Sequence, residues 1–289
     1  MDFPSLVDLQ EMLSLTEVQA NARVWKDMAG NLTGFAILTR DETSCSLIFE
    51  VAPHAIQINL VAQIIAWGEQ TAWQACPSYR GLLVLETRCL ADDLARRSIL
   101  EQHSFVKQSV GALHLFRPLD ELVPPPLPPT GFSIRSLAGE PEVEAWVTLH
   151  RAAFCTQNMT IEYRQAMMKV QGFEPDLDLV AVAPDGTLAA YCVGSINEEE
   201  NRLTGQKVGF TDPVATHPAY QRQGLARALL LEALDQLKKR GMLTARLNTN
   251  SENTAMQRAA QSAGFRELSR SITFSKTVSS NNQIAGKIA

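Results

Sequence analysis

One segment of the chain, residues 214–230, holds the residue types that most clearly indicate chemistry. It reads as a short strand, a turn at Pro218, a loop of small residues around Gly224, and a helix that starts directly after the loop. The first turn of a helix leaves backbone N–H groups without intrahelical partners and carries the positive end of the helix dipole. Such a terminus binds phosphate without a dedicated side chain. The segment therefore predicts a site for a phosphorylated ligand.

The helix that must hold this loop in place is amphipathic. Apolar residues recur along it every four positions and give one broad apolar face. A basic last turn precedes Gly241, and glycine is the residue type that most often follows the end of a helix. The apolar stripe consists of Leu225, Leu229, Ala233 and Leu237.

Strands and helices alternate around this helix, as in a mixed α/β fold. The clearest turn is Pro184-Asp185-Gly186, a strong β-hairpin signal between two apolar strands. The acidic run at 198–200 predicts a second turn, followed by one continuous strand at 207–214. The predicted strands are 131–137, 177–183, 188–197, 207–214, 243–248 and 270–276, and the other predicted helices are 143–154, 161–170 and 254–263.

A proline-rich segment predicts a boundary between two domains. Residues 123–129 contain five prolines, which fix φ and remove backbone donors, so this stretch is expected to be an extended connector. Residues 80–85 resemble residues 240–245 at an offset of 160 positions, which indicates two copies of one supersecondary unit. We therefore predict domains at 1–122 and 131–277, a linker at 123–130, and a loose polar tail at 278–289.

The predicted first copy lacks the residues that a phosphate loop needs. It contains a strand-rich segment at 22–51, a helix at 60–75, and further elements at 82–86, 92–102 and 109–117. No glycine occurs between Gly34 and Gly68, the interval in which the loop would lie. A backbone without small residues cannot approach a pyrophosphate closely. We expect this half to be structural or to shape the substrate site without binding a cofactor.

Composition excludes several classes of protein. The chain has 289 residues and a net charge of −5 without a block of like charges, which argues against nucleic-acid binding. No apolar run reaches the about 18 residues that a membrane helix needs. The five cysteines show no C-x-x-C spacing, so neither a zinc site nor a disulfide framework is expected. The start lacks the pattern of a secretory signal, and we expect a cytoplasmic protein without a bound metal.

These residues resemble the GNAT superfamily of acyl-CoA-dependent N-acyltransferases. The family signature, Q/R-x-x-G-x-G/A at the start of a helix, is matched by residues 221–226, and Asn253, Ala255 and Gly264-Phe265 lie at the family's spacing. The resemblance covers residues 131–277 and, more weakly, the first half as a degenerate copy. It implies the GNAT fold, an α/β (α+β) arrangement with a mixed sheet, in two tandem copies.

The resemblance also implies acetyl-CoA as the co-substrate and a position for each part of it. The pyrophosphate would bind the N–H groups of residues 222–227, and the pantetheine arm would run beside strand residues 214–216. A backbone N–H near Val214 would polarise the thioester carbonyl, and Asn253 would donate to the pantetheine or the phosphates. The implied cofactor-binding residues are Val214, Ala215, Thr216, Gln221, Arg222, Gln223, Gly224, Leu225, Ala226, Arg227 and Asn253.

Acetyl transfer to an amine also needs a base, and Asp212 is the candidate. It precedes Pro213 on the strand that leads into the cofactor loop, and Glu198, Glu199 and Glu200 are alternatives. Many family members carry a tyrosine that protonates the departing thiolate, but Ala260 occupies that position here. Tyr220 is no clear replacement.

The expected function is an N-acetyltransferase that moves the acetyl group by direct transfer to a primary amine of a small molecule or peptide. The alternative is a non-catalytic acyl-CoA-binding sensor or partner-binding module, which Ala260 favours. The acceptor cannot be named from these residues, because no motif specifies it. Both a monomer and a homodimer agree with the sequence.

Overall fold

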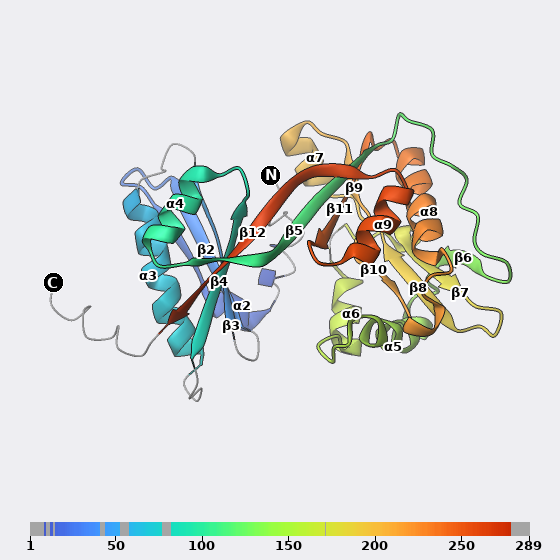
Figure 1. Cartoon of the computed structure of the whole chain (residues 1–289), viewed down its shortest axis with the longest axis horizontal. Helices are drawn as coiled ribbons and strands as arrows, with labels where there is room; N and C mark the ends of the chain where they lie inside the picture. The colour runs from blue at the N-terminus through green and yellow to red at the C-terminus, as the bar shows by residue number, and fades with distance from the viewer. Residues whose placement is uncertain are drawn as a thin grey trace. The chain divides into compact units, whose positions relative to one another are not determined.

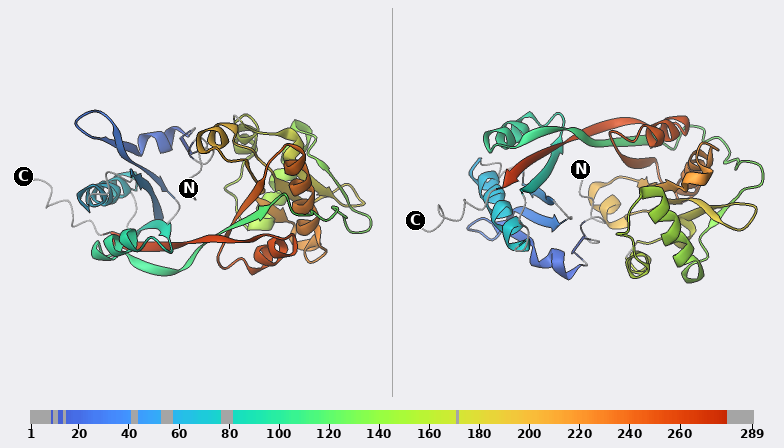
Figure 2. Two further views of the ribbon diagram at one scale, coloured as in Figure 1. Left: turned by 90° about the horizontal axis from the view of Figure 1, so that it is seen from above. Right: turned by 60° about the horizontal axis from the view of Figure 1, so that its bottom comes forward.

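The computed structural model describes residues 9, 12–13, 15–40, 44–52, 58–76, 82–170 and 172–278 (Figure 1). Contacts divide the chain into two compact units, one of residues 1–112 and 269–289 and one of residues 113–268. Strands β5 (Val106–Pro118) and β12 (Arg266–Val278) each supply residues to both units. They are neighbours in the sheet although far apart in sequence, as the green and red strands of Figure 2 show.

This division differs from the predicted domain bounds at both ends. The predicted linker at 123–130 lies inside the second unit, and residues 269–277 lie in the first unit. The reason is the length of β12, whose residues from Ser271 to Val278 pair antiparallel with β4 (Leu83–Leu90). The predicted tail lies outside the described residues beyond Val278.

The first unit is a sheet packed on helix α3 (Ile58–Ala75). Strand β3 pairs parallel with β4, and α3 supplies the crossover that a parallel pair requires. Buried residues of the sheet and α3, among them Leu47, Ile64 and Leu85, form one core. The interval that would correspond to the cofactor loop includes residues 53–57, which lie outside the described part of the chain. The remaining elements are α2 (Thr16–Ala20), β1 (Ala22–Lys26), β2 (Leu32–Arg40), β3 (Ser44–Val51) and α4 (Leu94–Gln102).

The second unit contains a four-stranded antiparallel sheet in the order β10-β8-β7-β6. The predicted hairpin joins β7 to β8, and Gly186 has the positive φ of +87° that its turn needs. Helix α5 packs on β8 and β10, and short helix α6 packs on α5. The elements are β6 (Ser133–Ser136), α5 (Val143–Phe154), α6 (Ile161–Met167), β7 (Asp178–Val182), β8 (Leu188–Val193) and β10 (Val214–Thr216).

Two predictions in this unit were wrong. The acidic run does not form a turn but begins helix α7 (Glu198–Thr204), because the Asn197 side chain accepts the N–H of Glu200 at 2.9 Å and the carboxylates face the positive end of the helix dipole. The continuous strand predicted at 207–214 is divided into β9 (Val208–Phe210) and β10. Pro213 has no N–H to donate to a ladder, and β9 and β10 pair with different strands.

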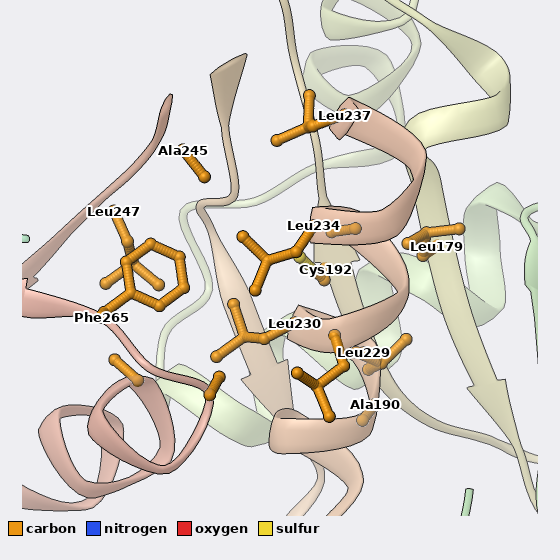
Figure 3. Close-up of a cluster of buried hydrophobic side chains, with 14 of the residues drawn as sticks. Leu179, Ala190, Cys192, Leu229, Leu230, Leu234, Leu237, Ala245, Leu247 and Phe265 are labelled. Atoms are coloured by element: carbon orange, nitrogen blue, oxygen red, sulfur yellow. The ribbon is translucent and has the colours of Figure 1, made fainter. Parts of the chain in front are cut away.

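Helix α8 (Leu225–Lys239) is the central element of the second unit, and its predicted apolar stripe is buried. Figure 3 shows Leu229, Leu230, Leu234 and Leu237 of this helix in one cluster with residues of the surrounding strands. These strand residues include Ala190, Cys192, Ala245 and Leu247. β11 (Thr244–Asn250) and α9 (Thr254–Ser262) complete the unit. Among the described residues, no helix is both long and apolar enough to cross a bilayer.

Candidate active site

The loop before α8 leads into three backbone N–H groups that the helix itself does not use. The first N–H that closes a helical hydrogen bond is that of Ala228, which donates to the Gly224 carbonyl at 3.0 Å. The N–H groups of residues 225–227 therefore have no helical acceptor. Among the described residues, no side chain caps the helix at Gly224, and residues 221–224 are exposed. This arrangement fits an anion such as a pyrophosphate.

Backbone conformation in this loop depends on two residues with positive φ. Gly224 has a φ of +86°, and Arg222 has a φ of +62°, which is uncommon for a residue with a Cβ. The Gln221 side chain donates to the Thr216 carbonyl at 3.4 Å and so ties the loop to β10. The Arg227 Nε donates to the Ser262 carbonyl at 3.1 Å, which places its guanidinium at the end of α9.

Strand β10, which leads into the loop, pairs with β8 along one edge, and its other edge is unpaired within the described sheet. Val193 donates to the Pro213 carbonyl at 3.0 Å, and His217 donates to the Ala189 carbonyl at 2.9 Å, so these groups face β8. Because backbone groups alternate along a strand, Ala215 also faces β8, whereas the N–H groups of Val214 and Thr216 face away from it. In the described part of the chain β10 is an edge strand, and this outer edge fits an extended ligand.

Asp212 follows β9 and lies next to the Asn248 side chain of the neighbouring strand β11. β9 and β11 run parallel, with Phe210 opposite Arg246, and two residues further along the Asn248 Nδ2 donates to the Asp212 Oδ2 at 3.5 Å. The other end of the same amide, Asn248 Oδ1, is 2.8 Å from His114 Nδ1 on β5. His114 and Asn248 were absent from the sequence predictions, since no local signal reveals a pairing of residues 134 positions apart.

Several predicted or suspected site residues have structural roles. The Asn253 Oδ1 caps α9 by accepting the Met256 N–H at 3.0 Å. Ala260 is fully buried in the core with Phe265 and supplies no proton donor. The Tyr220 ring packs edge-on against Phe132 at 5.9 Å between centroids.

Cys192 lies behind the junction of β9 and β10. Burial, and then the charge of Asp212, raise the pKa of the Cys192 thiol far above its ordinary value. Its Sγ donates to the Thr211 carbonyl at 3.5 Å. A thiol held in this form is a core side chain and not a nucleophile.

An aromatic and charged cluster fills the other face of the four-stranded sheet. Trp146 stacks on Tyr191 at 4.3 Å between centroids, and the Arg164 guanidinium lies over Trp146 at 4.1 Å and pairs with Asp178. The His150 Nδ1 is 2.7 Å from the Tyr191 hydroxyl. Burial, and then the charge of Arg164, lower the pKa of His150. The cluster fixes α5 and α6 on the sheet beside the candidate site.

Comparison with known proteins agrees with this geometry. Residues 143–265 match the family model described as the acetyltransferase (GNAT) family. A mycothiol acetyltransferase of Renibacterium salmoninarum is 27% identical over 263 residues, which cover 87% of this chain and 75% of the relative. A ribosomal protein bS18-alanine N-acetyltransferase of Escherichia coli is 36% identical over 83 residues, which cover 29% of this chain and 51% of the relative.

Two solved structures share the fold over most of the chain. A GCN5-related N-acetyltransferase from Sphaerobacter thermophilus has a TM-score of 0.74 at 22% identity and covers 89% of this chain and 81% of its own. A tandem GNAT protein from the clavulanic acid biosynthesis pathway has a TM-score of 0.70 at 15% identity and covers 96% and 90%. At these identities the likeness concerns the fold, and the predicted α/β fold with a mixed sheet is confirmed.

Proposed function

We propose that Asp212 is the general base of a direct acetyl transfer. The premise is that residues 143–265 match the acetyltransferase (GNAT) family and that the chain uses acetyl-CoA to acetylate an amine. The observation that carries the proposal is the position of Asp212, which lies two residues before β10 and accepts a hydrogen bond from the Asn248 amide. An amine must be neutral to attack a thioester, so a carboxylate that takes its proton accelerates the reaction.

The residues around Asp212 suit the parts of acetyl-CoA, which supplies the acetyl group as a reactive thioester. The N–H groups of residues 225–227 would hold the pyrophosphate, and the outer edge of β10 would hold the pantetheine arm as an added strand. The Val214 N–H would donate to the oxygen on which negative charge develops.

The departure of the thiolate needs no acid in this proposal. Ala260 is buried where family members place a tyrosine, so no proton donor comes from α9 at that position. A thiol has a pKa of about 8.5, and its thiolate is a good leaving group near neutral pH. General acid assistance is worth on the order of 10²–10⁴-fold, which would be lost here without abolishing turnover.

The acceptor class follows from how far each likeness extends. The similarity to a mycothiol acetyltransferase spans 87% of the chain, whereas that to a ribosomal protein alanine N-acetyltransferase spans 29%. A likeness that includes both halves supports a small-molecule amine related to mycothiol as the acceptor. A peptide amine is the second candidate, and we place the reaction in the cytoplasm, in a monomer or homodimer.

The deciding experiment combines turnover with cofactor binding. We expect Asp212→Asn to lower kcat by on the order of 10²–10⁴-fold and to leave the Kd for acetyl-CoA, measured calorimetrically, within about twofold. Asp235→Asn is the control, because Asp235 forms an exposed ion pair with Lys239 on α8 at 2.6 Å and such pairs contribute little. Unchanged turnover by Asp212→Asn, with the acceptor that the parent uses, would remove Asp212 from the mechanism.

A further inference from the structure

Three polar side chains form a row across three neighbouring strands of the second unit. The sheet order places β11 between β5 and β9. His114 on β5 is 2.8 Å from the Asn248 amide on β11, and that amide is 3.5 Å from the Asp212 carboxylate, which follows β9. The row therefore connects a buried imidazole to the proposed base through one amide.

The donors and acceptors in the row have a fixed direction. An ionised carboxylate only accepts hydrogen bonds, so Asp212 takes the Nδ2 end of Asn248. The Oδ1 end then faces His114 and can only accept, which requires a proton on the His114 Nδ1. An amide has no titratable proton at neutral pH, so the row orients the carboxylate and does not relay protons.

His114 is the rigid end of the row. Its side chain belongs to a residue that is only 6% exposed, between the buried Leu113 and Leu115. These two leucines point into the core with α8, so the alternation of a strand directs His114 to the opposite face. Asn248 is exposed and gains a fixed orientation from a partner that packing already holds.

We propose that His114 is a positioning residue for acetyl transfer, which holds the Asn248 amide so that Asn248 holds the Asp212 carboxylate beside the Val214 N–H. The proposal rests on the proposed role of Asp212 as the base. A base must lie within hydrogen-bond reach of the amine, and a displacement of about 1 Å can cost on the order of 100-fold in rate. Neither His114 nor Asn248 touches the reacting atoms in this scheme.

The test compares variants that keep or remove the donor. His114→Phe keeps a ring and removes the Nδ1–H, and we expect kcat to fall on the order of 10- to 100-fold while the KM for acetyl-CoA stays within about twofold. His114→Asn places an amide N–H near the same point and should recover most of the loss. Asn248→Leu changes an exposed side chain, so it should fold normally and lower kcat as His114→Phe does.

Double variants show whether the effect passes through Asp212. In an Asp212→Asn background, His114→Phe and Asn248→Leu should cause no further loss of kcat, because residues that act as a unit are not additive. If the fold-losses in kcat of the single variants multiply in the double variants, the proposal is overturned. Equal losses of kcat in His114→Phe and His114→Asn would also overturn it. If Asp212→Asn is slow but His114→Phe and Asn248→Leu turn over normally, the positioning role is refuted and the role of Asp212 as the base is not. Normal turnover by Asp212→Asn refutes the base as well.

Discussion

Gly224 takes a φ of +86°, and a Cβ placed there would meet no heavy atom within 4 Å. Glycine is therefore required by the backbone angle and not by crowding within the protein. Left-handed backbone costs a residue with a side chain about 1–2 kcal/mol, and relaxation of the angle would turn the N–H groups of the loop away from the ligand.

We expect Gly224→Ala to raise the Kd for acetyl-CoA by up to about tenfold, which corresponds to about 1.4 kcal/mol. Gly186→Ala is a matched control, since Gly186 has a φ of +87° and equally open surroundings in the hairpin between β7 and β8. Both variants should lose similar stability in thermal unfolding. If calorimetry gives Gly224→Ala the parental affinity, the loop does not bind through its backbone.

His150 gives the stability of the fold a dependence on pH. Its pKa in the folded protein is below the ordinary 6.5 because burial, and then Arg164, disfavour the charged ring. The unfolded chain therefore binds more protons near pH 6, so this contribution to stability is fully present above pH 6.5 and is lost as the pH falls through the folded pKa.

Thermal unfolding checks this dependence in the parent and in His150→Phe, which keeps a ring beside Trp146. The parental Tm should fall more steeply than that of the variant between about pH 7 and pH 5. Parallel curves for the two proteins would show that His150 is not the group that titrates.

The sequence predicts some residues of the candidate site but not others. The loop around Gly224 was predictable, because a loop and the helix after it are contiguous in the chain. Asn248 and His114 were not, because their contact joins β5 to β11 across 134 positions. Pairing between distant strands leaves no local spacing to read.

At the scale of elements, Gly209 fixes how closely α8 approaches β9. A Cβ on Gly209 would overlap the Leu237 side chain, so a larger residue fits beneath this turn of the helix only if Leu237 shifts. We expect Gly209→Ala to lower the free energy of unfolding by about 1–3 kcal/mol, the usual cost of overpacking. Denaturant unfolding measures this change.

The same contact predicts compensation. Leu237→Ala alone should cost about 2–5 kcal/mol through the cavity that it leaves, and the added methyl of Gly209→Ala would then occupy part of that space. The double variant should therefore lose less unfolding free energy than the sum of the two single losses. Additive losses would mean that α8 and β9 do not meet at this pair.

Elements with strong periodicity were predicted well, and those decided by one polar residue were not. Helices α5 and α8 follow their apolar stripes. Helix α7 was mistaken for a turn, because its start depends on one Asn197 cap rather than on an apolar face. The break between β9 and β10 reflects a change of pairing partner at Pro213, which a continuous apolar run conceals.

At the scale of the whole molecule, the proline-rich segment misplaces the start of the second unit. The chain does divide into two compact units, but composition marks a boundary only where the chain is irregular. Strand β5 enters the second unit at Leu113, eleven residues before Pro124, the first of those prolines. Leu113, Leu115 and Leu119 are each no more than 6% exposed in the core around α8.

This placement predicts the behaviour of fragments. Full burial of one leucine contributes about 1.5–3 kcal/mol, so three of them approach the about 5–15 kcal/mol that stabilises a whole domain. A fragment of residues 131–268 lacks all three and should fail to unfold cooperatively, whereas residues 113–268 should retain a cooperative transition. Circular dichroism during thermal unfolding distinguishes the two, with the intact chain as reference. A shorter fragment as stable as the longer one would show that β5 adds nothing to this core, and His114 would then have no rigid strand from which to orient Asn248.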